Sequence, residues 1–454
     1  MNVKDDGGRT HELVGELGTG GQGSVYATQD ERYVVKVLRL PDEAARDQWL
    51  RRLSAVRNLP LEDLKIARPI RLLQRPHVGY VMERVPGAQP LASLCQVPHV
   101  EATPGEWYVR TGGLRRRLAV LARTARLLGH LHSRGLVYGD PSPANVLFSG
   151  DDTVSLIDVD NLRYASKPLS ERVLTPWFAA PEVYAGRSGV NSLTDAFAFA
   201  AMAFQTLTLV HPLLGDQVSQ DEAEAEEAAL RGEWPWIDHP HDDRNRSSTG
   251  LPRTLVLTPA LRALAEQTFG EGLLDPLARP GLSAWEEALW EAMDRLLACP
   301  SCGAEADHTL AECPWCEVSR GPYVLAGVQV TDQEVTDLAS AQGVPAPTMN
   351  LGTVVIGTDG ARYIQPRHFT GEAQGASHVE LTFRDGRLSV RSLDKATYTL
   401  RRETRDKDDV PVEQEGKPKR FPLAPGRSAW QLHLGALAGQ HRLVTFDLVE
   451  RAQQ

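Results

Sequence analysis

The stretch LVYGDPSPANVLF, residues 136–148, sets two oxygen-bearing side chains between apolar runs. Asp140 and Asn145 stand five residues apart in it, and Asp158 follows thirteen residues after Asn145 in the segment VSLIDVD. Carboxylate and amide oxygens in loops beside apolar strands are hard ligands suited to Mg²⁺. One carboxylate would have to stay free to receive a hydroxyl proton. A single Asp in such a loop is most often a turn residue, so the interpretation depends on what precedes it.

Upstream, the segment LGTGGQGSV places Gly18, Gly20 and Gly23 in the spacing G-x-G-x-x-G, with Val25 two residues further on. Glycines let the backbone approach phosphate oxygens because no Cβ intervenes. The spacing alone is weak evidence. A dinucleotide-binding fold would need a helix next, whereas the strand-like SVYAT follows here. The segment therefore favours a β-hairpin that covers a nucleotide.

Lys36 lies in the apolar run VVKVL, thirteen residues after Gly23. A lysine at such a position is costly unless its ammonium has an anionic partner, although a lysine snorkelling from a half-buried strand would also fit. The other motifs in the sequence decide between these two interpretations of Lys36. A glycine-rich turn, Lys36, the Asp140/Asn145 pair and Asp158 in this order are hard to obtain by chance. The set predicts that Lys36 binds the α- and β-phosphates of ATP.

Length and composition limit the remaining possibilities. A chain of 454 residues with 42% hydrophobic and 24% charged residues predicts a globular protein of two or three domains. The net charge of −10 argues against a nucleic-acid partner. No apolar signal segment is visible at the start, and the most apolar run, 196–210, is short for a membrane span. The sequence predicts a cytoplasmic protein with no membrane partner.

The pattern of apolar residues predicts an α+β fold with two lobes. Residues 11–85 alternate short β-branched runs with turns and contain one helical stretch at 41–56, which predicts a strand-rich small lobe. Residues 86–297 carry helical periods and predict a large lobe. Its helices are expected near 114–135, 194–210, 221–231, 258–268 and 283–298.

These motifs resemble those of eukaryotic-type serine/threonine protein kinases, in a divergent bacterial form, over residues 11–297. The segment TPWFAAPEV resembles the end of the activation segment, and Arg279 in DPLARP would be the buried partner of its Glu182. Asp195 in LTDAFAFAAMAF would hold the backbone of the catalytic loop. The resemblance implies a bilobal protein-kinase fold.

The resemblance also implies the role of each site residue. Asp140 is the base that orients the substrate hydroxyl, Asn145 and Asp158 hold Mg²⁺ or Mn²⁺, and Lys36 anchors the phosphates of ATP. Thr175 stands where serine/threonine kinases keep a threonine near the catalytic Asp. In YVMERV, Met82 is the gatekeeper beside adenine. The nucleotide-binding set comprises Gly18, Gly20, Gly23, Val25, Lys36, Asp47 and the backbones of Glu83 and Val85.

The chain departs from the family pattern at several positions. H-R-D reads Tyr-Gly-Asp140, so the arginine that senses an activation-loop phosphate is missing. The catalytic-loop lysine is Ser142, and D-F-G reads Asp158-Val-Asp160, so the flexible glycine is missing. The segment LIDVDN resembles instead the I-D-x-D metal motif of a divergent group of bacterial kinases. The helix glutamate that should pair with the phosphate-binding lysine has no clear equivalent, and Asp47 is the residue we choose for it. No departure removes a metal ligand or the base, so we interpret the loop as catalytically competent.

A second signal lies at residues 298–320. Cys299, Cys302, Cys313 and Cys316 form the pattern C-x₂-C-x₁₀-C-x₂-C, and each pair encloses a proline. Two such turns can present four thiolates tetrahedrally. Four unrelated reduced cysteines are a poor explanation of this spacing. The pattern predicts a zinc ribbon whose Zn²⁺ is structural.

Residues 321–454 carry short β-branched runs separated by turn residues and no helical period, which predicts an all-β sandwich. The region resembles in part a forkhead-associated domain, which reads phosphothreonine. His378 and Arg387 fall at matching places, but Thr358 replaces the arginine expected after VVIG. Because phosphothreonine capture needs arginines, a sandwich for protein contacts is the preferred interpretation.

The sequence therefore predicts ATP- and Mg²⁺-dependent transfer of the γ-phosphoryl group to Ser/Thr hydroxyls of protein substrates. Kinases with such a ribbon are similar to those of bacterial tellurite-resistance and stress clusters. That resemblance implies two partners, a metal-dependent protein phosphatase and a von Willebrand-type domain protein. One alternative is a nucleotide-binding pseudokinase scaffold. A small-molecule kinase shares the G-D-x-x-x-x-N loop but lacks the A-P-E segment and its arginine partner, both present here.

Overall fold

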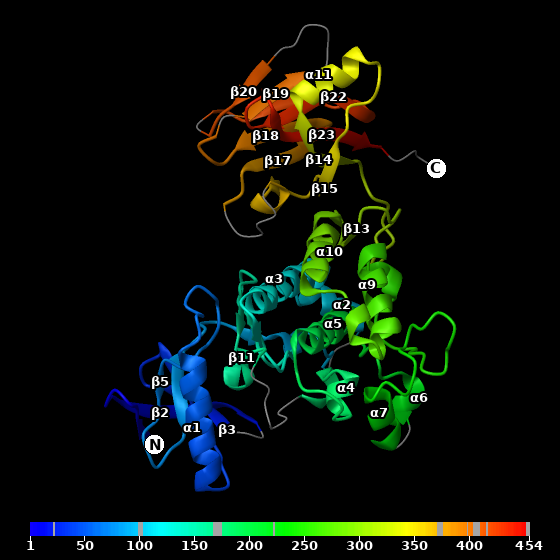
Figure 1. The fold of residues 1–454 in the computed structure, drawn as a ribbon. Coiled ribbons are helices and arrows are strands. Elements are labelled where there is room, and N and C mark those ends of the chain that lie inside the picture. The colour runs from blue at the N-terminus through cyan, green and yellow to red at the C-terminus, as the bar shows by residue number, and fades with distance from the viewer. Residues whose placement is uncertain are drawn as a thin grey trace. The chain divides into compact units, whose positions relative to one another are not determined.

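The computed structural model describes residues 1–20, 23–98, 103–166, 175–220, 223–369, 376–396, 398–402, 409–414 and 416–450. The chain forms two compact units (Figure 1). The first comprises Met1–Gly112 and Arg116–Trp290, and the second comprises Gly113–Arg115 and Glu291–Gln454. Each unit has a hydrophobic core of its own.

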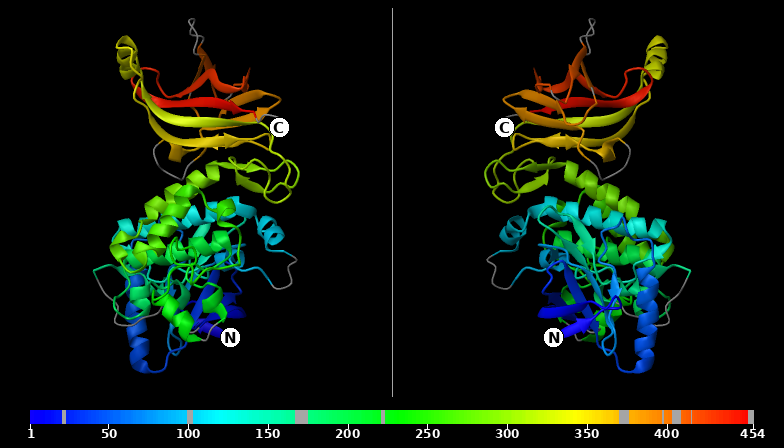
Figure 2. Two further views of the ribbon diagram at one scale, coloured as in Figure 1. Left: turned by 90° about the vertical axis from the view of Figure 1, so that its right-hand side faces the viewer. Right: turned by 90° about the vertical axis from the view of Figure 1, so that its left-hand side faces the viewer.

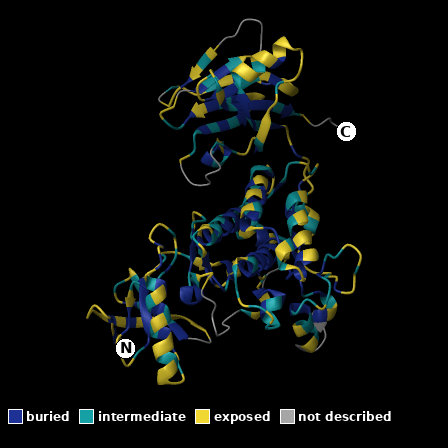
Figure 3. Cartoon of the chain, in the orientation of Figure 1, coloured by how far each residue is buried: buried dark blue, intermediate teal, exposed yellow. Residues whose placement is uncertain are grey.

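A six-stranded antiparallel sheet in the order β1-β2-β3-β4-β6-β5 builds the small lobe. Its strands are β1 (Asn2–Lys4), β2 (Thr10–Gly20), β3 (Gly23–Thr28), β4 (Tyr33–Leu38), β5 (Arg71–Leu72) and β6 (Gly79–Glu83). Helix α1 (Glu43–Arg57) buries Trp49 and Leu53 in the core with residues of this sheet. The outer face of α1 is exposed (Figure 3). Asp42 caps the helix by accepting a hydrogen bond from the Ala45 N–H at 2.8 Å.

The small lobe begins before residue 11, where the sequence pattern placed its start. Strand β1 pairs with β2, and Val3 lies opposite His11. Val3 is buried in a second cluster with Leu13 and Val81. The added strand therefore extends the sheet because its one apolar side chain completes this cluster.

The large lobe is helical. Its helices are α2 (Pro104–Arg110), α3 (Gly113–Ser133), α4 (Pro181–Tyr184), α5 (Ser192–Thr208), α6 (Asp216–Gln220), α7 (Ala223–Leu230), α8 (Arg253–Val256), α9 (Pro259–Phe269) and α10 (Leu282–Asp294). The expected helix 221–231 corresponds to α7, and its first two residues lie outside the described residues. Every residue of α5 from 194 to 208 is buried. The prediction of a buried core helix at 196–210 is confirmed, although the helix ends at Thr208.

The described helices were compared with the length and apolar character of membrane-spanning helices. In the described part of the chain, no helix combines the length and the apolar character that a membrane span needs. The apolar run in α5 instead packs inside the large lobe, where Phe197 and Phe204 contact Phe269 edge to face with ring centroids 5.7 and 5.9 Å apart.

Short strands frame the catalytic loop. Strand β8 (Leu136–Val137) pairs with β11 (Arg163–Tyr164), and β9 (Val146–Phe148) pairs with both β10 (Val154–Leu156) and β7 (Gln89–Pro90). The loop 138–145 runs from β8 to β9, and Asp158 follows the end of β10 after one intervening residue. The antiparallel β9–β10 hairpin thus returns the chain to the catalytic loop, which is why distant sequence positions meet there.

The second unit begins with a small two-stranded element and continues into two larger sheets. Strands β12 (Leu296–Ala298) and β13 (Glu305–Asp307) flank the first cysteine pair. The six-stranded sheet has the order β15-β14-β23-β22-β19-β20, and the four-stranded sheet has the order β16-β17-β18-β21. Their strands are β14 (Tyr323–Asp332), β15 (Met349–Ile356), β16 (Arg362–Ile364), β17 (Val379–Arg384), β18 (Arg387–Ser392), β19 (Tyr398–Arg402), β20 (Asp409–Val412), β21 (Lys419–Pro422), β22 (Gly426–Leu434) and β23 (Gln440–Val449).

The two sheets lie over one another as a sandwich (Figure 2). One hydrophobic cluster joins them and contains Val324 and Phe446 from the first sheet and Leu381 and Val390 from the second. The expectation of an all-β region is wrong in one detail, because helix α11 (Gln333–Ala341) lies between β14 and β15. The Asp332 carboxylate caps α11 by accepting hydrogen bonds from two backbone N–H groups.

The cysteine segment and the sandwich fall in one compact unit, whereas the sequence pattern suggested two domains meeting near residue 320. Leu297 shares a cluster with Tyr323 and Val355. Arg320 donates a hydrogen bond to the Leu297 carbonyl oxygen at 3.0 Å. The segment is too small for a core of its own, so it completes its packing on the sandwich.

Candidate functional site

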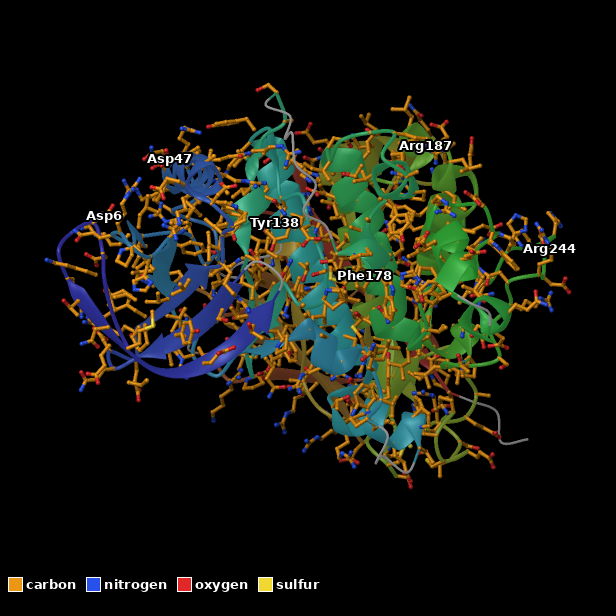
Figure 4. The ribbon with its side chains drawn as sticks, turned by 90° about the horizontal axis from the view of Figure 1, so that it is seen from below. Asp6, Asp47, Tyr138, Phe178, Arg187 and Arg244 are labelled. Carbon is orange, nitrogen blue, oxygen red and sulfur yellow. The ribbon has the colours of Figure 1, made fainter. Side chains whose placement is uncertain are left out.

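The backbone of the loop 138–145 is held by a buried carboxylate on helix α5. Asp195, which is 1% exposed, accepts hydrogen bonds from the N–H groups of Tyr138 at 2.8 Å and Gly139 at 3.0 Å. Gly139 has a φ of +91°, and a Cβ there would come within 3.0 Å of Asn161. The position therefore needs glycine. Figure 4 shows Tyr138 near the middle of the first unit.

Asp140, Asn145 and Thr175 form one hydrogen-bonded group. The Thr175 N–H and hydroxyl donate to the two carboxylate oxygens of Asp140 at 2.8 and 3.0 Å. The Asn145 amide donates to the Asp140 backbone oxygen at 3.0 Å. Burial raises the pKa of Asp140 to about 6, although the bonds from Thr175 oppose this effect. The carboxylate is fixed in orientation, and its pKa is shifted toward neutral pH. Both properties suit a group that receives a hydroxyl proton.

The structure brings Lys36 to two carboxylates. Its Nζ lies 2.5 Å from Asp158 Oδ1 and 2.5 Å from Asp160 Oδ2. Burial by itself would lower the pKa of Lys36, but the charges of Asp160 and Asp158 outweigh burial and raise it. Asp158 adopts a left-handed conformation with a φ of +54° at the point where β10 gives way to the Val159–Asn161 turn. This conformation turns the chain sharply and sets both acids toward the lysine.

The prediction that Asp47 pairs with Lys36 is wrong. The Asp47 side chain is 51% exposed, and its Oδ1 pairs with Arg75 at 3.5 Å. Figure 4 shows Asp47 at the edge of the small lobe. Since α1 buries Trp49 and Leu53, the helix phase turns Asp47 to solvent. Asp160 holds the place beside Lys36 instead.

The register of the small-lobe sheet aligns the predicted nucleotide-binding residues. Gly18 lies opposite Val25 between β2 and β3, and Val25 lies opposite Lys36 between β3 and β4. Directly opposed residues share one face of a sheet. A Cβ at Gly18 or Gly20 would meet no atom of the described residues within 4 Å apart from its chain neighbours, which leaves room for a ligand on this side of the hairpin.

Gly23 and the hinge residues also take defined positions. A Cβ at Gly23 would come within 2.2 Å of the Val37 oxygen, so the close approach of β3 to β4 needs a glycine. Met82 is buried on β6, Glu83 ends that strand, and Val85 lies in the link to the large lobe. Glycine positions, lysine and hinge thus border one face of the small lobe.

The end of the activation segment is fixed by a bidentate ion pair. The two terminal nitrogens of Arg279 donate to the two carboxylate oxygens of Glu182, each at 2.8 Å. The Arg279 side chain is fully buried and also donates to the Gly272 carbonyl oxygen at 2.7 Å. Residues 167–174 of the segment lie outside the described residues.

Replacing Arg279 by Met is expected to lower the free energy of unfolding by about 3 kcal/mol, because the mostly buried Glu182 would lose its counter-ion. Urea unfolding measures the loss. Arg231→Gln is the matched control, since Arg231 pairs with Glu227 and Glu233 at the surface, where ion pairs contribute little to stability. Equal losses in the two variants would contradict the buried role of Arg279.

His211 links α5 to the same segment. One ring nitrogen, Nε2, donates to the Trp177 oxygen at 2.8 Å, and Nδ1 accepts from the Leu213 N–H at 3.2 Å. This pair of contacts selects the neutral ring. Burial lowers the pKa of His211 to about 4, although the bond to Trp177 opposes this effect.

The depressed pKa predicts loss of stability in mild acid. Unfolded chains protonate histidine near pH 6.5, so the contribution of His211 is present above that pH and disappears as the pH falls toward 4. Between pH 7 and pH 5 the wild type should lose about 2 kcal/mol more unfolding free energy than His211→Gln. Urea unfolding at both values tests this, and identical pH slopes would contradict it.

The four cysteines of the second unit converge. Their sulfur atoms lie within 4.8 Å of one another, with Sγ–Sγ distances of 3.5 Å for Cys299–Cys316 and 3.6 Å for Cys302–Cys313. A tetrahedral Zn²⁺ with Zn–S bonds of about 2.3 Å requires sulfurs about 3.8 Å apart. The four cysteines therefore fit a Zn²⁺ ion as a set.

The first unit combines a strand-rich lobe, a helical lobe and the group of Lys36, Asp140, Asn145 and Asp158, which is the arrangement of a protein kinase domain. Residues 11–268, more than half of the chain, match the protein kinase domain family. The chain belongs to that family.

Several similar proteins carry serine/threonine-kinase names. The DNA damage-responsive serine/threonine-protein kinase RqkA of Deinococcus radiodurans is 28% identical over 225 residues, which cover 45% of this chain and 31% of RqkA. The putative serine/threonine-protein kinase PRKY of Homo sapiens is 27% identical over 214 residues, 44% of this chain and 70% of PRKY. KIN28 of Saccharomyces cerevisiae is 30% identical over 126 residues, 26% of this chain and 41% of KIN28. The chain thus spans less than half the length of RqkA and of KIN28.

Two site features were missed at the sequence level. The contact of Asp160 with Lys36 is one, because the I-D-x-D segment suggests a metal motif and not a partner for the lysine. The other is Arg52, which donates to Asn161 Oδ1 at 2.7 Å. The signal for Asp160 was present, because a second acid two residues after a metal ligand, beside a buried lysine, is a potential counter-ion. Nothing in the spacing of the α1 residues points to Arg52.

Proposed function

We propose that this chain is an active protein kinase that transfers the γ-phosphoryl group of ATP, with Mg²⁺ or Mn²⁺, to serine and threonine hydroxyls of proteins. The observation that carries the proposal is the Asp140 carboxylate, held by Thr175 beside Asn145 and in the same lobe interface as the Lys36–Asp158 pair. A scaffold that only holds nucleotide has no need for a carboxylate oriented in this way.

Each residue has a task in this reaction. Lys36 binds phosphate oxygens, and the β2–β3 hairpin with its glycines covers them. Asn145 and Asp158 would hold the metal ion, which neutralises phosphate charge when it is bound. Asp140 orients the acceptor hydroxyl and takes up its proton. Thr175 positions Asp140, which also favours serine and threonine acceptors.

The catalytic loop lacks the positive charge of the lysine in the family pattern, because Ser142 stands in its place. Ser142 is 1% exposed, and its hydroxyl has no hydrogen-bond partner among the described residues. It therefore points into the protein and offers nothing to the γ-phosphate. We infer that Lys36 and the metal ion carry the neutralisation of phosphate charge in this kinase.

The second unit is proposed to recruit proteins. Its cysteines fit a structural Zn²⁺, and its sandwich, which resembles a forkhead-associated domain in part, offers exposed strand edges for contacts. A role in bacterial stress signalling, with a metal-dependent phosphatase and a von Willebrand-type protein as partners, is supported by the resemblance and by the damage-responsive name of RqkA.

The experiment is phosphate transfer from labelled ATP to the chain itself and to casein, with Mg²⁺ or with EDTA. The wild type should label both proteins with Mg²⁺ only, and Asp158→Asn should lose the label because it removes a proposed metal ligand. Equal labelling of wild type and Asp158→Asn would contradict the proposal. Nucleotide binding without any transfer would favour the pseudokinase scaffold.

A further inference from the structure

Asp160 is an unusual residue for its place. Its side chain is 1% exposed, and the buried hydroxyl of Tyr80 lies beside it as a neutral neighbour. Burying a carboxylate is costly unless an opposite charge compensates it. The Oδ2 atom of Asp160 lies 2.5 Å from Lys36 Nζ. Compensation by Lys36 is therefore what permits an acid at this position.

The two acids beside Lys36 differ in access. The Asp158 side chain is 38% exposed, whereas Asp160 is 1% exposed. An accessible carboxylate can turn to a metal ion that arrives with the nucleotide. The Asp160 carboxylate is closed to solvent and cannot turn to a metal ion that arrives from there. Its contact with Lys36 therefore persists when Asp158 binds the metal.

Helix α1 contributes no acid to this lysine. Its acids Glu43 and Asp47 are about half exposed and lie near Arg75. The helix instead sends Arg52 to the Asn161 side chain, next to Asp160. The charge that α1 presents to the active-site turn is thus positive, the reverse of the acid that the family resemblance led us to expect.

We propose that Asp160 is the positioning residue of Lys36, which holds its ammonium in place for phosphate binding without any acid from helix α1. The proposal rests on the proposed function, because the role of Lys36 toward ATP is part of that function. The two residues of this pair then lie on strand β4 and on the turn after β10, and helix α1 takes no part. Displacement of α1 should leave the Lys36–Asp160 contact intact.

The kinetic test is a cycle of wild type, Asp160→Asn, Lys36→Met and the double variant. Asp160→Asn should lower kcat/KM for ATP by roughly 10²-fold through misplacement of Lys36. In the Lys36→Met background the same change should have no further effect, since its target is gone. An Asp160 effect that persists there, or an increased Mg²⁺ requirement, would overturn the proposal in favour of a metal ligand.

A second readout needs no activity. Lys36→Met should melt at a lower temperature than the Lys36→Met/Asp160→Asn double variant, by about 5 °C or more, because only the single variant buries an uncompensated carboxylate. This comparison holds even if Asp160→Asn alone does not fold. If wild type transfers no phosphate, the proposed function fails while the melting test still decides the pairing. Melting at the same temperature would overturn the proposal.

The matched control is Glu43→Gln combined with Asp47→Asn, which removes the two α1 acids nearest Arg75. The proposal expects KM for ATP and kcat within about twofold of wild type, as for other exposed charges. A loss as large as that of Asp160→Asn would show that α1 supplies the functional acid and would overturn it.

Discussion

Replacing Asp140 by Asn is expected to lower kcat for phosphate transfer by roughly 10²- to 10⁴-fold, the contribution of a general base in proton transfer. Asparagine keeps the size of the side chain and can still contact Thr175, but it cannot take up the hydroxyl proton. Nucleotide affinity should remain near that of wild type, because Asp140 contacts Thr175 and Asn145 rather than Lys36. Steady-state kinetics and ADP binding measure both quantities.

The control for this prediction is Thr175→Ala, which removes one of the two hydrogen bonds from Thr175 to Asp140 and keeps the one from the backbone N–H. We expect a smaller loss of kcat, since the base remains present and half anchored. A variant Asp140→Asn with wild-type kcat would show that the carboxylate is not the base.

Loss of the metal from the cysteine cluster is the second large effect. The double variant Cys302→Ser/Cys313→Ser should contain no zinc and should lose the order of residues 298–320, because binding of structural zinc supplies about 10 kcal/mol or more to such small elements. Metal analysis and hydrogen exchange measure the two outcomes. Wild type should hold one zinc per chain.

Cys95 offers the matched cysteine control. It is buried in the first unit, and its sulfur contacts the Thr206 hydroxyl at 3.3 Å. Cys95→Ala should keep one zinc per chain and full protection of the cluster. Zinc content unchanged in Cys302→Ser/Cys313→Ser, or equal protection after chelation, would contradict the assignment.

The catalytic loop could be found from sequence because its chemistry is local. Asp140 and Asn145 sit in one loop between two short strands, so their spacing in the chain nearly fixes their spacing in space. The cysteine pairs have the same property. Lys36 and Asp158 are distant in sequence, yet each lies in a recognisable motif, and the order of these motifs along the chain is that of the kinase family.

The partner of Lys36 could not be found in the same way. Which residue of α1 faces Lys36 depends on the rotation of that helix, and the rotation is set by burial of Trp49 and Leu53. A shift of a single residue turns a side chain by about 100°, so Asp47 was assigned to the wrong face. Asp160 stands where the family pattern has a glycine, and its I-D-x-D context suggests a metal motif and not a partner of Lys36.

The second unit shows a similar limit. Helix α11 has nine residues, and the clearest sign of it in the sequence is the capping residue Asp332. An aspartate is equally common in turns, so it does not distinguish a helix start from a turn. The packing of Leu297 against Tyr323 and Val355 joins the cysteine segment to the sandwich. Such contacts between separate segments leave no periodic trace in a single sequence.

Phosphoamino acid analysis of the purified chain after incubation with labelled ATP and Mg²⁺ tests the central claim most directly. The account predicts phosphoserine and phosphothreonine in the wild type and neither in Asp140→Asn. A wild-type chain that binds ATP but yields no phosphorylated residue, or that yields the same products after Asp140→Asn, would contradict it.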